Sequence, residues 1–240
     1  MWVLALDTTT RDGGVALVRD GAVAAVRAGE AGLSHAERIP SDVRAVLGDA
    51  GLDLGAVDVI AVATGPGGFT GLRIGIAAAH GLAAALGRPA LGVPALTALA
   101  WDLLDRMPDQ RVAGAWLDAS RGEVFAAACA RPRPPAPSWP PHEVAPPTAA
   151  SPDVTAAAWA ATVPAGTPVA VVGPEALLDR VCAAGLRAAP PAASLAAVVG
   201  RIAWHVSQRG PIDAATLAPV YVRRPDAEIE RDRRAAAERP

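Results

Sequence analysis

The sequence predicts a mixed α/β fold built from two related half-domains, the second of them reduced. Two observations carry this prediction. Residues 1–107 alternate between short apolar runs, typical of strands, and longer runs with apolar residues at helical spacing. A strand that ends at an aspartate, followed by a tight turn and a second strand, opens the chain and recurs at Val112–Ala128. With 240 residues, 52% of them hydrophobic, the chain can bury a substantial core.

The first half is predicted to follow the order β-β-β-α-β-α-β-α. Its first three strands are joined by tight turns, and Asp20-Gly21 is a hairpin signal. Ser34 and Glu37 have the spacing of a capping box at a helix start. Pro40 marks either a kink or the first turn of that helix, and both remain open. We expect strands at 2–6, 14–18, 22–26, 57–63 and 90–93, and helices at 34–48, 72–86 and 95–105.

The second half is predicted to be shorter and interrupted. Strands are expected at 112–117, 123–128 and 169–172, and helices at 174–184 and 194–208. Nine prolines between Arg131 and Asp153 predict an extended linker or loop. The organisation predicted is therefore a half-domain at 1–107, a reduced half-domain at 108–223 with a proline-rich insertion at 131–153, and a charged, disordered tail at 224–240.

A glycine-rich loop, Thr64–Gly75, lies between a predicted strand and a predicted helix. Such a turn suits an anion at the helix N-terminus or the close approach of another backbone. A Walker A loop is excluded because the chain contains no lysine. A dinucleotide-binding fingerprint is disfavoured because Thr70 stands at its third glycine position.

Composition narrows the function classes further. A net charge of −2 and only 4% aromatic residues do not favour direct nucleic-acid binding. Cys129 and Cys182 form neither a disulfide framework nor a zinc spacing, which favours a reducing cytoplasm. The N-terminus is not a signal peptide, and the apolar stretch Ile74–Leu86 is short for a membrane span. We therefore expect a cytoplasmic chain with no membrane partner.

Four segments carry a resemblance to a known family. Leu6–Thr9, Gly65–Gly75, Asp118–Val124 and Pro219–Arg223 resemble the TsaB family, formerly called YeaZ, and the match extends in order to residue 223. This family belongs to the bacterial machinery that makes threonylcarbamoyladenosine in tRNA. The resemblance implies an actin-like ATPase (ribonuclease H-like) fold, shared with Hsp70 and sugar kinases. One position departs from the family: Ser120 stands where an arginine is usual, and Arg121 follows it.

The resemblance also implies a non-catalytic scaffold. Its partners would be TsaD, the catalytic paralogue, and TsaE, an accessory ATPase, with a homodimer when TsaD is missing and tRNA contacted only through the complex. TsaD holds a metal with a His-x-x-x-His pair. Here His35 occupies the first position and Ile39 the second, so neither a metal site nor a cofactor is predicted.

The residues of the chain do not favour a catalytic role. It has no Gly-x-Ser-x-Gly motif and no lysine to serve as a base or a Schiff-base amine. Asp7, Thr8, Thr9 and Gly13 occupy the place of a phosphate site in the superfamily, and we interpret them as vestigial, with Asp7 structural rather than catalytic.

A partner interface is predicted on two helices. Small residues line helix 71–86, and a small-residue face allows another helix to approach closely, although packing inside the chain must use one face. An apolar ridge on helix 34–48 is expected to contribute as well. The predicted interface comprises His35, Ile39, Val43, Leu47, Gly71, Arg73, Gly75, Ala78 and Ala85, with Ala78 and Ala85 as outward positions.

Two other function classes remain open at this stage. The first is an ATP-dependent kinase or ATPase of the actin-like superfamily, which would bind nucleotide tightly and turn it over without partners. The second is the peptidase activity once attached to the wider family, which would require a stoichiometric metal.

Overall fold

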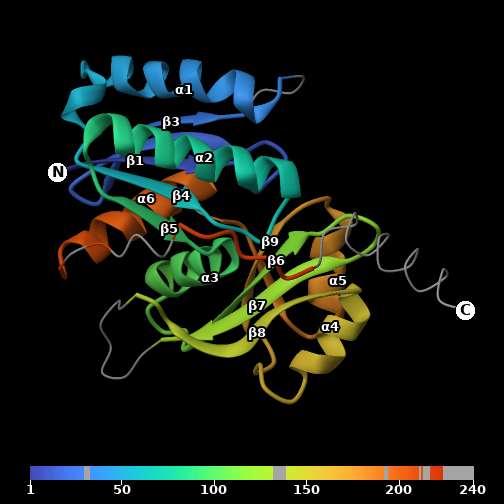
Figure 1. The fold of residues 1–240 in the computed structure, drawn as a ribbon. Coiled ribbons are helices and arrows are strands. Elements are labelled where there is room, and N and C mark those ends of the chain that lie inside the picture. Colours follow the sequence, from blue (N-terminus) through green and yellow to red (C-terminus); the bar gives the residue numbers. More distant parts are fainter. Residues whose placement is uncertain (30–32, 132–138, 192–193, 211, 213–216, 224–240) are drawn as a thin grey trace, which may run out of the picture.

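Two five-stranded sheets form the framework of the chain (Figure 1). The computed structural model describes residues 1–29, 33–131, 139–191, 194–210, 212 and 217–223. The first sheet and its helices come from the first half of the chain: β1 (Trp2–Asp7), β2 (Gly14–Arg19), β3 (Ala22–Ala28), α1 (His35–Asp49), η1 (Leu54–Ala56), β4 (Val59–Ala63), α2 (Phe69–Leu86), β5 (Ala90–Val93) and α3 (Ala95–Arg106).

The second half repeats this order of elements. Its strands are arranged as β10-β9-β6-β7-β8, which matches β5-β4-β1-β2-β3 in the first sheet. The elements are β6 (Val112–Asp118), β7 (Val124–Ala130), β8 (His142–Ala150), α4 (Pro152–Trp159), β9 (Pro168–Val172), α5 (Ala176–Ala183), β10 (Arg187–Ala189) and α6 (Leu195–Ser207). The actin-like α/β prediction is confirmed, and the reduction lies mainly in the lengths of the outer helices.

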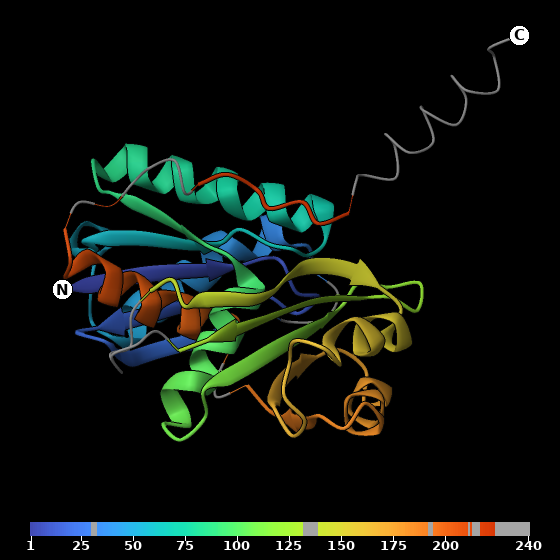
Figure 2. The same ribbon diagram turned by 90° about the horizontal axis from the view of Figure 1, so that it is seen from below.

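The layers follow from the alternation of side chains along β1. Leu4 and Leu6 point toward α1 and α2 and form one core with them. Val3 and Ala5 point the other way, into a central core that contains α3 and α6. Helix α6 covers the first sheet and α3 covers the second, while α4 and α5 cover the outer face of the second sheet (Figure 2).

Most predicted elements are confirmed. The three-strand meander pairs β1 antiparallel to β2 and β2 antiparallel to β3, and β1 runs parallel to β4. The capping box at Ser34 is present, and Pro40 lies inside α1 rather than in its first turn. Helix α2 ends where Gly87 adopts a left-handed conformation, φ 60°, as the Gly-Arg-Pro signal predicts.

The interpretation of residues 131–153 as a linker or loop is wrong for its second part. Residues 142–150 form β8, which pairs with β7, and Pro152 opens α4. Strand β8 lies at the edge of its sheet, where a proline need not donate to a further strand. Pro146 and Pro147 are tolerated there, in a ladder whose register shifts. Residues 132–138 and the tail at 224–240 lie outside the described residues.

Helix α2 is longer than the sequence predicts. It begins at Phe69, and among the described residues it is the one helix long and apolar enough to meet the length and composition of a membrane span. It packs on the first sheet through Leu72, Gly75, Ile76 and Ala79. The remainder of its surface is largely exposed.

Candidate functional site

A cleft lies between the two halves, at the carboxyl ends of their central strands. Its volume is about 740 Å³, within the range of small-molecule pockets. It is bounded by the β1–β2 turn and the loop before α2 on one side, and by the equivalent segments of the second half on the other. The lining residues are Thr8–Asp12, His35, Gly67, Gly68, Gly71, Leu117, Asp118, Ser120 and Val172–Pro174.

Asp7 ends β1 beside this cleft, and internal hydrogen bonds engage its carboxylate. One oxygen, Oδ1, accepts from the backbone N–H of Thr9 at 2.8 Å and from its hydroxyl at 2.7 Å. The other, Oδ2, accepts from the hydroxyl of Thr10 at 2.6 Å. Asp7 is 2% exposed. Both oxygens therefore hold the turn in shape, which supports the structural role inferred from the sequence.

The predicted phosphate-site residues Asp7, Thr8, Thr9 and Gly13 do lie together in this turn. Gly13 has φ +59°, and a Cβ there would lie 2.7 Å from the backbone oxygen of Asp7 and 2.8 Å from His35. The turn is thus closed on one side by the start of α1. The sequence alone did not predict that His35 packs on Gly13.

The glycines of the loop and of α2 serve this same turn. A Cβ on Gly71 would lie 2.2 Å from the backbone oxygen of Thr8, and one on Gly75 would lie 2.1 Å from the Thr8 hydroxyl oxygen. A Cβ on Gly67 would lie 2.3 Å from the Thr9 oxygen. Of the two uses that the sequence left open, close backbone approach is therefore the one these three glycines have. Gly71 and Gly75 pack inside the chain instead of facing a partner.

His35 and Arg38 brace the turn from α1. A guanidinium nitrogen of Arg38 donates to the backbone oxygen of Asp12 at 2.8 Å and lies 3.2 Å from Nδ1 of His35. Burial lowers the pKa of His35 below its ordinary value, and the positive charge of Arg38 lowers it further. Arg38 is 4% exposed, and no pattern in the sequence singled it out.

The second half contains the same turn in a simpler form. Asp118 ends β6 as Asp7 ends β1, and its Oδ1 accepts from the backbone N–H of Ser120 at 2.9 Å. Ser120 and Arg121 both have positive φ, 61° and 57°. Ser120, the residue that departs from the family pattern, lines the cleft.

The apolar ridge predicted as an interface on α1 is not available to a partner. Ile39, Val43 and Leu47 are all buried against the first sheet. That part of the prediction is wrong, because the apolar stripe of an amphipathic helix covers the chain's own core.

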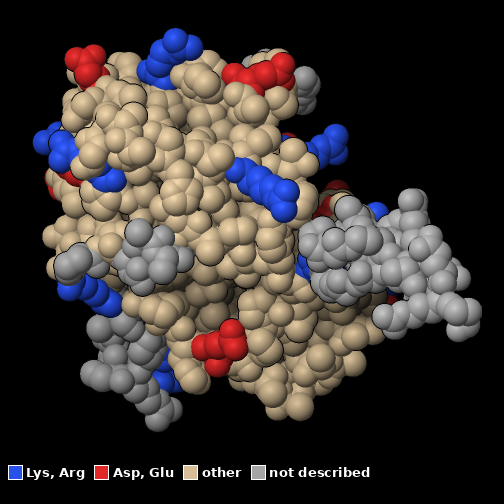
Figure 3. Space-filling view, in the orientation of Figure 1, with Lys and Arg blue, Asp and Glu red and all other residues tan. Residues whose placement is uncertain are grey.

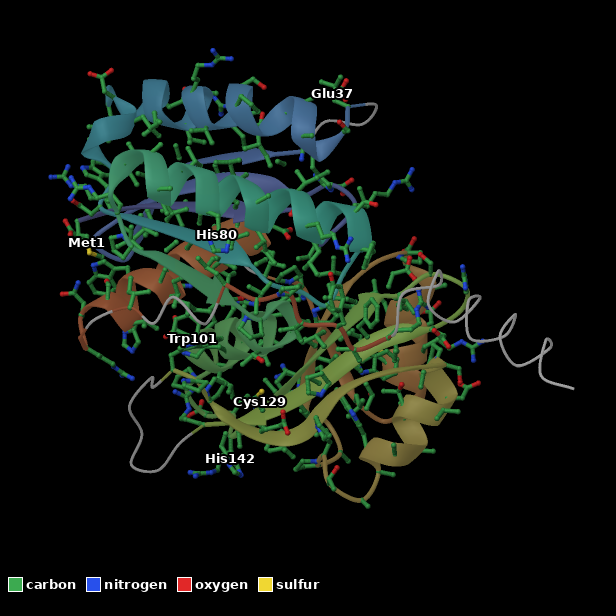
Figure 4. All side chains as sticks on the ribbon, in the orientation of Figure 1. Met1, Glu37, His80, Trp101, Cys129 and His142 are labelled. Carbon is green, nitrogen blue, oxygen red and sulfur yellow. The ribbon has the colours of Figure 1, made fainter. Side chains whose placement is uncertain are left out.

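The outward face of α2 is exposed and carries small residues. Ala78 is half-buried and packs against the core, whereas Ala85 is exposed. The other outward positions are Ala77, His80, Gly81 and Ala84. The surface over α2 is mostly uncharged (Figure 3), and His80 is labelled on this helix in Figure 4. Arg73, at the start of the helix, is also exposed.

Residues 27–131 match the family of TsaD, tRNA N6-adenosine threonylcarbamoyltransferase. The tRNA threonylcarbamoyladenosine biosynthesis protein TsaB of Escherichia coli is 38% identical over 125 residues, covering 52% of this chain and 53% of the relative. TsaB of Haemophilus influenzae is 35% identical over 123 residues, 51% of each. The aligned part of the chain thus spans about half the length of these relatives.

The solved structure of YeaZ from Pseudomonas aeruginosa extends the likeness over nearly the whole chain. It has a TM-score of 0.68 at 28% identity, covering 92% of this chain and 100% of that one. The chain is thus similar to TsaB in sequence over about half its length and to YeaZ in structure over nearly all of it. An activator of 2-hydroxyisocaproyl-CoA dehydratase from Clostridium difficile, with a TM-score of 0.51 at 9% identity, shares the fold alone.

One exposed aromatic pair was not among the site residues predicted from the sequence. Phe69 and Tyr221 are large, exposed and adjacent, with ring centroids 5.5 Å apart. Tyr221 lies within Pro219–Arg223, one of the segments that carry the family resemblance, so a signal was present in the sequence. No group of three or more metal-ligating side chains occurs in the described part of the chain.

Proposed function

We propose that this chain is a non-catalytic subunit of the tRNA threonylcarbamoyladenosine machinery that presents the outward face of α2 to a TsaD-type partner. The observation that carries the proposal is that face itself. Ala77, Gly81 and Ala84 are exposed along one side of an eighteen-residue helix whose buried residues already pack on the first sheet. Small side chains let a second helix approach closely, and because Ala77, Gly81 and Ala84 are uncharged, the penalty for desolvating them is low.

The scaffold role is supported by the state of the β1–β2 turn. The Asp7 carboxylate is held by Thr9 and Thr10, so it is occupied by structural hydrogen bonds. The chain also has no lysine to contact a phosphate. In this proposal chemistry belongs to the partner. A TsaE-type ATPase is a further partner, tRNA is reached through the complex, and the assembly works in the cytoplasm.

A homodimer through the same face is the form proposed when the TsaD-type partner is missing. One α2 face cannot serve both contacts at once, so homodimer and heterodimer would compete. Arg73 and Ala85, from the interface predicted by sequence, remain exposed and stay within the proposed face. The other predicted positions are buried or packed within the chain and are left out of the proposed face: His35, Ile39, Val43, Leu47, Gly71, Gly75 and the half-buried Ala78.

The test is co-purification with a TsaD-type threonylcarbamoyltransferase, followed by calorimetry and an assay of tRNA modification. We expect Ala77→Arg and Ala84→Arg each to raise the dissociation constant by about 100-fold or more, because each would bury an unpaired charge. Leu178→Arg is the matched control. Leu178 is 38% exposed on α5, the equivalent helix of the second half.

Two outcomes would contradict the proposal. If both alanine variants stay folded by circular dichroism and bind like the wild type, the interface lies elsewhere. If the wild-type chain neither binds the transferase nor changes its activity, the assignment as a subunit fails.

Nucleotide binding is the second candidate, because the cleft has the size of a ligand site and lies between the repeated turns. Calorimetric titration of the isolated chain with ATP and Mg²⁺ tests it. Tight binding with turnover that Asp7→Ala abolishes would favour a superfamily kinase or ATPase over a scaffold.

A further inference from the structure

Residues 217–223, called here the strap, run from the first half of the molecule to the second without regular secondary structure. Leu217 is buried in the core between α1, α2 and the first sheet. The backbone N–H of Val220 donates to the backbone oxygen of Thr64 at 2.8 Å, just after β4. A Cβ on Gly65 would lie 3.0 Å from the Val220 oxygen, so the absence of a side chain at Gly65 lets the strap backbone pack closely there. The strap is therefore seated on the first half.

The middle of the strap contacts the first turns of α2. The ring of Tyr221 packs on that of Phe69, and its hydroxyl oxygen accepts from Nε of Arg73 at 3.2 Å. The guanidinium carbon of Arg73 lies 3.8 Å from the centre of the Phe69 ring. These three side chains fix the N-terminal end of α2, the helix that carries the proposed partner face. Figure 2 shows the red C-terminal segment beside α2.

The end of the strap is held by the second half. A guanidinium nitrogen of Arg223 forms an ion pair with Oε2 of Glu123 at 2.8 Å, and its guanidinium carbon lies 5.8 Å from the centre of the Phe125 ring. Val222 packs against the central core. Glu123 immediately precedes β7, next to the turn that lines the cleft. Within three residues the chain thus passes from the helix of one half to the hairpin of the other.

We infer that the strap is a clasp that couples the start of α2 to the β6–β7 hairpin, so that the geometry of the partner face depends on the second half. This inference deepens the proposed function and rests on it only for the partner readout. The strap contacts are partly exposed, with Tyr221 at 43%, and such contacts open at lower free energy than a buried core. Opening the Arg223 end would loosen Tyr221 and then the first turns of α2.

The test is amide hydrogen exchange on the full chain carrying Arg223→Ala. The readout is the set of amides at 72–75, which Arg223 does not touch, together with those at 123–125 and that of Val220. We expect exchange to rise roughly 3- to 10-fold in all three places, the factors that correspond to losing one partly exposed ion pair and one cation–π contact. Arg223→Lys, which keeps the charge, should restore part of the protection.

The matched control is Arg180→Ala. Arg180 forms an exposed ion pair with Asp153 at 3.1 Å, but both residues lie in the second half. It should leave exchange at 72–75 unchanged. If Arg223→Ala affects only 123–125, or if the control affects 72–75 equally, the clasp is overturned whatever the chain binds.

The partner readout separates this inference from the proposed function. With a TsaD-type partner, Arg223→Ala should weaken binding by about the same factor as the rise in exchange at 72–75. If exchange behaves as expected but the wild-type chain binds no such partner, the clasp stands and the proposed function fails. If the partner binds the wild type and the variant equally while exchange at 72–75 rises, coupling to the partner face is refuted.

Discussion

The two halves share a strand order but differ in what lies outside their sheets. In the first half α1 has 15 residues and α2 has 18. Their counterparts α4 and α5 have 8 residues each. The short helices also leave most of their residues uncovered, but the exposed face of α5 carries Asp179 and Arg180, whereas the exposed face of α2 is longer and has small residues along most of its length. The repeated sheet therefore supplies the scaffold, and the extra helix length of the first half supplies the candidate interface.

The two strand-ending aspartates differ in the same direction. Asp7 is buried and accepts three hydrogen bonds, while Asp118 is exposed and accepts one from Ser120. The first turn is also packed against α2 through Gly71 and Gly75. In the second half Asp118 only shapes its turn, whereas in the first half Asp7 and its turn are part of the packed core.

Replacing each aspartate by alanine gives the largest expected contrast. Asp7→Ala should lower the free energy of unfolding by about 3 kcal/mol, because it removes charged hydrogen bonds and leaves buried hydroxyl and amide donors unpaired. Asp118→Ala should cost about 1 kcal/mol or less, since water can replace its contact. Urea denaturation measures both. Equal losses would mean that burial does not distinguish the two turns.

Two glycines of α2 differ in whether a side chain would fit at their position. Gly71→Ala should destabilise the chain by ~1–3 kcal/mol, because the new methyl group meets the backbone of Thr8, which cannot easily move. Gly81 has open space where a Cβ would stand, so Gly81→Ala should stabilise the chain by about 0.5–1 kcal/mol through helix propensity. Thermal unfolding followed by circular dichroism checks the signs. Stabilisation by Gly71→Ala would show that the turn does not pack on α2 as described.

The smallest expected effect is a pH dependence from His35. Its pKa in the folded chain is lowered from 6.5 by burial first and by Arg38 second, with Asp7 opposing. The unfolded chain therefore binds the proton first as the pH falls. The contribution of His35 to stability is unaffected above pH 6.5 and declines below it. His35→Gln should flatten that decline in denaturation curves recorded between pH 7.5 and about 5. An unchanged slope would rule out His35 as its source.

The sequence predicted elements wherever a local signal dictates them. The capping box at Ser34 and the Gly87 stop gave correct helix ends. Strand β8 was missed because its prolines are acceptable only at a sheet edge, and edge position is a long-range property. The three residues of β10 are too few to show a periodicity. The division at residue 107 stays a prediction, since α3 packs on the second sheet.

The site was predictable in its parts but not in its contacts. The strand-end position of Asp7 indicated a turn residue, and the structure gives it that role. An amphipathic stripe indicates that Ile39, Val43 and Leu47 are covered, but not whether the chain or a partner covers them. The glycine-rich loop predicted either an anion site or close backbone approach, and Thr8, the residue that Gly71 and Gly75 approach, lies over sixty positions earlier in the chain.

Helix α3 packs on the second sheet and α6 on the first, and this exchange affects how the chain folds. Each repeat ends in a helix that completes the sheet of the other repeat, so neither repeat contains its own full core. Cutting the chain between Arg106 and Val112 would leave two fragments, each with an uncovered sheet face, that should remain largely unstructured or aggregate until mixed. The intact protein should then unfold in a single cooperative transition, and the duplicated halves behave as one folding unit.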